Sequence, residues 1–265
     1  MNYSSRFFLY APIVLFLALA AGVSLYWWHA ASAFEQKLAA IKGREAMPGV
    51  TLDWASAEVG GFPFRVDAVF TGFTARGQGP HGAFRWQSPH FALHRLTYMP
   101  NRLVFEAAGR QDLSWVDAAG RPRSTSFQPG SLHASALLNE TGLARFDLDI
   151  TQFAMPALTA ARVQFHLRQG PNDTIEMVGS AEGTKGDLGL MYEKQVKQLR
   201  VYNTLVRAKP YAAVLKGEAA PAAAHAAWHD AGGAANVTRT ELNGVENGMR
   251  PEQAGHIVSL MEALY

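Results

Sequence analysis

The feature that most constrains this sequence is an uncharged apolar run near its N-terminus. Residues 7–28 read FFLYAPIVLFLALAAGVSLYWW. At about 1.5 Å of rise per residue, a helix of this length measures about 33 Å, which is enough to cross a hydrocarbon core of about 30 Å. Aromatic side chains with a polar N–H or O–H group favour the membrane–water interface, so we expect Tyr26, Trp27 and Trp28 to lie there. The run predicts an N-terminal transmembrane anchor over residues 1–29.

The charge before this run predicts the orientation of the anchor. Arg6 and the free amino terminus precede it, and positive charge is retained on the cytoplasmic side. A cleaved signal peptide also begins with a basic residue, and residues 31–33 (ASA) have the form of a cleavage site. Against cleavage, the run is longer than an ordinary signal h-region of about 7–15 residues. We therefore expect a single-pass inner-membrane protein with a periplasmic C-terminal domain. A cleaved signal and a buried soluble helix remain alternatives.

Composition narrows the class of the exported domain. The formal net charge is only +2, and the small Lys and Arg surplus gives no basic stripe, so we predict no nucleic-acid partner. The chain has no cysteine, which excludes disulfides, thiolate nucleophiles and cysteine-type zinc sites. The domain must therefore be stabilised by its core, and the chain after the anchor is long enough to form one.

Residues 30–48 predict a juxtamembrane helix that acts as a stalk. Phe34, Leu38 and Ile41 recur at helical spacing on one face, and Gly43 is expected to end the helix. The exported domain is then expected over residues 49–265.

Two-residue alternation dominates the next part of the chain, about residues 50–180. For example, Phe64, Val66 and Phe70 alternate with Arg65 and Asp67, as in a half-buried strand. Gly- and Pro-rich turn signals separate several such runs, and no segment of helical period interrupts them. We predict an α+β, mainly antiparallel fold in which a curved β-meander sheet packs with a few helices from the C-terminal half.

The second half of the domain is predicted to supply those helices, over about residues 187–231. In residues 187–207 the apolar residues recur at three and four, and basic residues fall largely off that stripe. Such a helix either packs on the sheet or contacts anionic lipid. The Ala-rich residues 217–233 indicate a loop and a short helix. A late strand follows at about 235–243, and a terminal helix at 251–264.

Motifs that could carry chemistry are weak. Residues 77–82 (GQGPHG) match the dinucleotide pattern, but no helix follows them, so they indicate a hairpin turn. His225 and His229 are four apart in the Ala-rich segment, and His90 and His94 share that spacing in a strand. Neither pair has a third ligand that the sequence can place. We predict no catalytic residue, no metal and no cofactor.

The most distinctive stretch is residues 59–67 (VGGFPFRVD), which predicts a structural corner with Phe62 and Phe64 as core anchors. Its motif residues are Gly61, Phe62, Pro63, Phe64, Arg65 and Asp67. Together with the N-terminal membrane helix, this element resembles the uncharacterised bacterial family known as domain of unknown function 2125. The resemblance implies an inner-membrane-anchored, periplasm-facing protein and implies no reaction. A looser likeness to the AsmA-type envelope proteins is architectural only.

Three functions follow as hypotheses. A long sheet with one aromatic-rich face favours a non-enzymatic envelope protein that binds lipid or another apolar ligand along its sheet. The alternative is a structural or scaffolding partner of an envelope protein complex. A hydrolase is a third candidate, and it requires His90, His94 or His225 to meet a carboxylate in one pocket.

Overall fold

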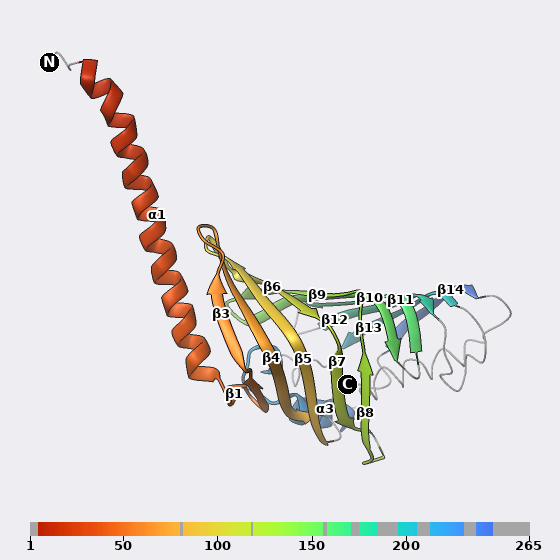
Figure 1. Ribbon diagram of the computed structural model, residues 1–265. Helices are drawn as coiled ribbons and strands as arrows, with labels where there is room; N and C mark the ends of the chain where they lie inside the picture. Colours follow the sequence, from red (N-terminus) through yellow and green to blue (C-terminus); the bar gives the residue numbers. More distant parts are fainter. Residues whose placement is uncertain are drawn as a thin grey trace.

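The computed structural model describes residues 5–79, 82–117, 119–155, 158–170, 175–184, 196–205, 213–230 and 237–245. Within these residues, a long N-terminal helix leads into an open, curved sheet of 14 strands (Figure 1). All strand pairs of this sheet are antiparallel, which confirms the predicted fold class. The named elements are α1 (Ser5–Ile41), β1 (Arg44–Met47), β2 (Val50–Asp53), β3 (Ser56–Gly60), β4 (Arg65–Gly79), β5 (Gly82–Leu96), β6 (Met99–Ala108), β7 (Gln111–Val116), β8 (Pro122–Phe127), β9 (Ser131–Asn139), β10 (Gly142–Met155), β11 (Leu158–Gln169), β12 (Ile175–Thr184), β13 (Val196–Leu205), α3 (Pro221–Asp230) and β14 (Val237–Val245).

Most neighbours in the sheet are also neighbours in the sequence, as hairpin connections require. The main path runs β1-β2-β4-β5-β6-β9-β10-β11-β12-β13-β14. β3 pairs with β4, and the β7–β8 hairpin joins β5 beside β6. β5 can serve both partners because its first half pairs with β7 and its second half with β6. The predicted β-meander is therefore confirmed, with two branches, β3 and the β7–β8 hairpin.

Helix α1 has two parts with different surroundings. It is long and apolar enough to cross a membrane, and none of the residues in its most apolar window is buried against the rest of the protein. Farther along, Ala31, Phe34 and Leu38 are buried. The face predicted from helical spacing thus packs on the domain, and the segment predicted as a stalk does not stand free. At Gly43 the backbone adopts a φ of 67°, and β1 follows directly.

The main core forms where α1 meets the first strands. Phe34 and Leu38 of the helix cluster with Trp54 and with alternate residues of β4, including Val66 and Phe70. Burying a side chain of this size stabilises the fold by about 1.5–3 kcal/mol. Further aromatic rings of β4, β5 and β6 extend this cluster across the sheet. One face of the sheet is therefore apolar, and α1 covers only its first strands.

Residues 213–230 contact the sheet at two places, on β11 and β12 and on β4. Leu215 packs with Ile175, Leu167 and Met177 of β11 and β12. Ala224 of α3 is buried, and α3 contacts β4 (Figure 1). On the apolar face of β6 and β10, Leu103, Phe105, Phe146 and Leu148 are only half-buried, whereas Ala107 and Ile150 are buried.

The prediction of a helix over residues 187–207 is wrong for Val196–Leu205, which forms β13. The segment is compatible with both the helical and the two-residue period, because apolar residues also recur at alternate positions, such as Leu199, Val201 and Leu205. Pairing decides between them, since β12 and β14 each satisfy one edge of β13. Residues 187–195, 206–207 and the predicted terminal helix at 251–264 lie outside the described residues.

Two other predictions for this half of the domain are confirmed. The short Ala-rich helix is α3, and the late strand is β14. The strand is longer than predicted at its end, because pairing with β13 continues to Val245.

Candidate functional site

The motif at residues 61–67 forms a tight corner that leads into β4. The N–H of Arg65 donates to the carbonyl of Gly61 at 2.9 Å, and Phe62–Pro63 is a cis peptide bond. Gly61 has a φ of 97°, and a Cβ there would lie 2.8 Å from Asp67 Oδ2. Only glycine fits this position without strain. The corner is joined to the β5–β6 turn, because the carbonyl of Phe64 accepts hydrogen bonds from the Thr97 N–H and hydroxyl, both at 3.0 Å.

The prediction that Phe62 and Phe64 are core anchors is wrong. Their exposed fractions are 57 % and 63 %. The alternation that places Val66 in the core begins only where the ladder begins, at Arg65 opposite Leu96. Phe64 precedes that pair and lies in the turn. It therefore does not share the apolar face, although it continues the two-residue alternation in the sequence.

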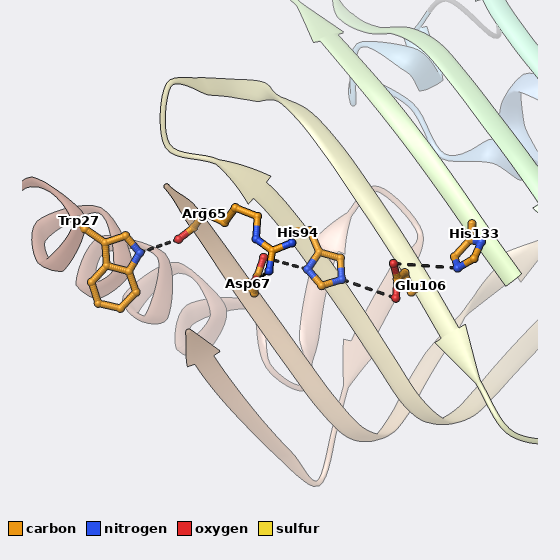
Figure 2. A network of polar contacts seen from close by, with 6 residues as sticks. All are labelled: Trp27, Arg65, Asp67, His94, Glu106 and His133. Atoms are coloured by element: carbon orange, nitrogen blue, oxygen red, sulfur yellow. Dashed lines mark hydrogen bonds and ion pairs between the residues drawn. The ribbon is translucent and has the colours of Figure 1, made fainter. Parts of the chain in front are cut away.

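Two of the three predicted interfacial aromatics of α1 contact this corner or the adjoining β5–β6 turn. Trp27 Nε1 donates to the carbonyl of Arg65 at 2.5 Å (Figure 2). The Trp27 ring also packs edge-on against Phe62, with centroids 5.5 Å apart. Tyr26 donates its hydroxyl to the carbonyl of Thr97 at 3.1 Å. Trp28 points away and is 65 % exposed. Arg6 lies within α1, and its side chain is outside the described part of the protein.

A line of acidic and basic side chains begins at the same corner and runs across the opposite, polar face of the sheet. Asp67 is buried and lies 2.8 Å from His94 Nδ1 and 3.1 Å from Arg65 Nη2. His94 Nε2 lies 3.9 Å from Glu106, whose other oxygen lies 4.0 Å from His133 Nε2 (Figure 2). The four residues from Asp67 to His133 come from β4, β5, β6 and β9, and thus alternate acid and histidine from strand to strand.

The same alternation continues on β10 and β11. Asp147 contacts His166 Nδ1 at 2.7 Å and Arg145 Nε at 2.7 Å, and Arg162 binds Asp149 through two hydrogen bonds of 2.7 and 2.9 Å. Desolvation alone would raise the pKa of Asp147, but hydrogen bonds from Arg145 and His166 outweigh it and lower that pKa. The hydrogen-bonded Arg162 guanidinium lowers the pKa of Asp149. We call the whole set, from Asp67 to Arg162, the polar band.

The chemistry that the polar band supports is electrostatic rather than nucleophilic. His94 and Asp67 form a dyad of the kind that activates a hydroxyl, but the second nitrogen of His94 faces Glu106. Among the described residues no hydroxyl bonds to His94, and no group of three His, Asp or Glu side chains is arranged to hold a metal ion. The histidine–carboxylate contact that a hydrolase requires is therefore present in His94 and Asp67. No nucleophilic hydroxyl joins that pair among the described residues.

Of the other predicted histidines, His90 is described with its side chain, and it does not join this set. His90 is exposed on β5, opposite Thr71 and Ala108. His225 and His229 lie in α3, and their side chains are outside the described part. Sequence reasoning missed the polar band because each strand shows only its own polar positions. The register between strands, which brings Asp67 opposite His94 and Glu106 opposite His133, is not visible in a single strand.

One family comparison covers most of the chain. Residues 27–244 match the family described as "Uncharacterized protein conserved in bacteria (DUF2125)". The match begins at Trp27, where α1 first contacts the sheet, and ends within β14. A search of curated proteins found no match to the chain.

Proposed function

Since the chain belongs to the bacterial family DUF2125, whose description assigns no activity, we propose a function from its geometry. The protein is a membrane-anchored, periplasm-facing envelope protein that binds lipid, through its acyl chain, along the apolar face of its sheet. The observation that carries this proposal is a strip of half-buried apolar side chains on that face.

The strip is formed by β6, β9 and β10. Its members are Leu103, Phe105, Leu132, Phe146 and Leu148, and all are only partly buried. Register aligns them, because Phe105 lies opposite Ala134 and Ala134 lies opposite Leu148. The small side chains of β9 lie in the middle of the strip, and such an extended apolar surface suits an acyl chain better than a compact ligand.

The anchor supports lipid over other apolar ligands. An apolar strip of this kind favours whichever apolar molecule is most concentrated around it. α1 is fixed to the sheet through Tyr26 and Trp27, so the domain cannot leave the membrane surface. The basic Arg6 before the apolar run favours the orientation with the domain in the periplasm.

Lipid occupancy can be tested with two neighbouring substitutions on β6. Phe105→Gln places a polar group in the strip, whereas Val104→Gln changes the opposite face, where Val104 is 36 % exposed. Full-length protein extracted into polymer-bounded membrane discs is transferred to mild detergent and examined by native mass spectrometry. Wild type and Val104→Gln are expected to retain phospholipid, and Phe105→Gln to retain several-fold less. Equal retention by both folded variants, or a lipid-free wild type, contradicts the proposal.

A scaffolding role is the second candidate, and the polar band favours it. Alternating charges across six strands form a surface that a partner with complementary charges can bind in one orientation. Crosslinking in cells with a photoreactive residue at Val104 is expected to give one repeated envelope-protein product. Lipid products alone would count against this role.

A further inference from the structure

The corner between β3 and β4 and the adjoining β5–β6 turn expose four large apolar side chains. The exposed fractions are 57 % for Phe62, 63 % for Phe64, 65 % for Tyr98 and 47 % for Met99. The two turns are adjacent, because the Phe64 carbonyl bonds to Thr97. An exposed apolar cluster on a domain that otherwise alternates its faces regularly requires a partner.

The position of this cluster relative to α1 identifies that partner. Tyr26 bonds to the Thr97 carbonyl and Trp27 to the Arg65 carbonyl, and the Trp27 ring touches Phe62. These contacts are made at the residues where the exposed apolar part of α1 ends. In Figure 1 the corner lies beside the middle of α1, on the side of the sheet from which the N-terminal half of the helix departs.

We propose that Phe62, Phe64, Tyr98 and Met99 form a second membrane contact, which inserts into the interfacial layer of the bilayer beside α1. This inference goes beyond the proposed ligand-binding role and rests on α1 as the membrane span. Tyr26 and Trp27 set the depth of this contact in the bilayer. Both lie in the turn of α1 that is expected at the membrane–water interface, so the groups bonded to them lie at the same depth. Phe, Tyr and Met are the side-chain types that enter this layer without carrying a charge into it.

The contact gives the domain a fixed orientation. A single helix leaves a domain free to rotate about the helix axis, whereas a second contact at its side removes that freedom. It also accounts for the exposure of Phe62 and Phe64, two large aromatic side chains at the surface of the domain.

The absence of cysteine makes a direct test possible, since one introduced cysteine is the only labelling site. Met99→Cys is compared with Met47→Cys, a methionine of β1 with a similar exposed fraction of 52 %. Met47 follows the end of α1, whose Ile41 lies about 20 Å along the helix axis from Trp27. Phe64→Cys provides a second position in the corner. Each full-length variant carries an environment-sensitive fluorophore and is reconstituted into nanodiscs of phosphatidylethanolamine and phosphatidylglycerol.

Lipids with a doxyl group near the head of the acyl chain then quench the label by contact. We expect quenching at Met99→Cys and Phe64→Cys to be about two-fold or more stronger than at Met47→Cys, with emission shifted to the blue. Equal quenching at all three positions overturns the proposal. So does a corner label that is shielded from aqueous iodide without being quenched by lipid, because that pattern indicates a protein partner. If α1 did not anchor the chain, no variant would float with the nanodiscs, so the two failures are distinguishable.

Discussion

At the scale of single residues, the corner depends on one glycine. Gly61 combines a φ of 97° with contacts that a Cβ would make at 2.8 Å to Asp67 and 2.9 Å to the Arg65 carbonyl. We expect Gly61→Ala to lower the free energy of unfolding by about 2 kcal/mol, because both the backbone conformation and the space exclude a side chain. The measurement is chemical denaturation of the full chain in nanodiscs. The neighbouring Gly60 has open space around it, so Gly60→Ala is the control and is expected to change little. Equal effects of the two substitutions would contradict the assigned geometry.

Also at this scale, the polar band predicts loss of stability in acid. The folded-state pKa of Asp149 lies below its ordinary value of 3.8, so its pairing with Arg162 stabilises the fold above that value. This stabilisation disappears as the pH falls through the lowered pKa, because the folded carboxylate must then bind a proton. Asp149→Asn is therefore expected to unfold more easily than wild type at neutral pH, and the difference is expected to shrink below about pH 4.

The pH dependence is measured by urea denaturation from pH 7 to pH 3. Arg162→Met removes the same pair from its other side, so it should give the same profile as Asp149→Asn. If the double substitution were additive across the whole pH range, the pair would not be coupled and the prediction would be wrong.

At the scale of elements, α1 serves as both membrane span and core helix. Phe34 and Leu38 lie in the main core cluster, whereas Lys37 between them is exposed. Phe34→Ala is expected to destabilise the domain by about 3 kcal/mol through lost burial and the cavity that remains. Lys37→Ala is expected to change stability by no more than about 0.5 kcal/mol. Thermal unfolding in nanodiscs measures both. An unchanged Phe34→Ala variant would indicate that residues 30–41 stand free as a stalk.

Element prediction succeeded where one period dominates the segment and failed where two compete. Val66, Ala68 and Phe70 are buried at alternate positions of β4, as their pattern predicts. Val196–Leu205 fits a helix and a strand equally well, and the edge of β12 decides. The corner shows a second limit, because Phe64 continues the alternation in sequence but lies before the ladder starts.

At the scale of the whole molecule, retention of α1 is the prediction to test. If the anchor is not cleaved, the chain given by this sequence keeps its full mass of 28.8 kDa and stays with membranes under alkaline carbonate. Cleavage after Ala33 would give a shorter, extractable protein, and intact-mass measurement separates the two outcomes. Alkaline phosphatase fused to the C-terminus is expected to be active, because the fusion partner folds only in the periplasm. An inactive, stable fusion would contradict the proposed orientation.

The sequence by itself determined the apolar span, the strand-rich class and the position of the corner motif, because each depends on residues close together in the chain. A long uncharged apolar run identifies a membrane span, and two-residue alternation identifies a strand, without knowledge of any neighbouring segment. Only the tertiary structure decided that Trp27 and Tyr26 bond to the corner, that Phe62 and Phe64 stay exposed, and that Asp67 meets His94. These facts depend on the register between strands and on where α1 meets them, and both are set by contacts between segments far apart in the sequence.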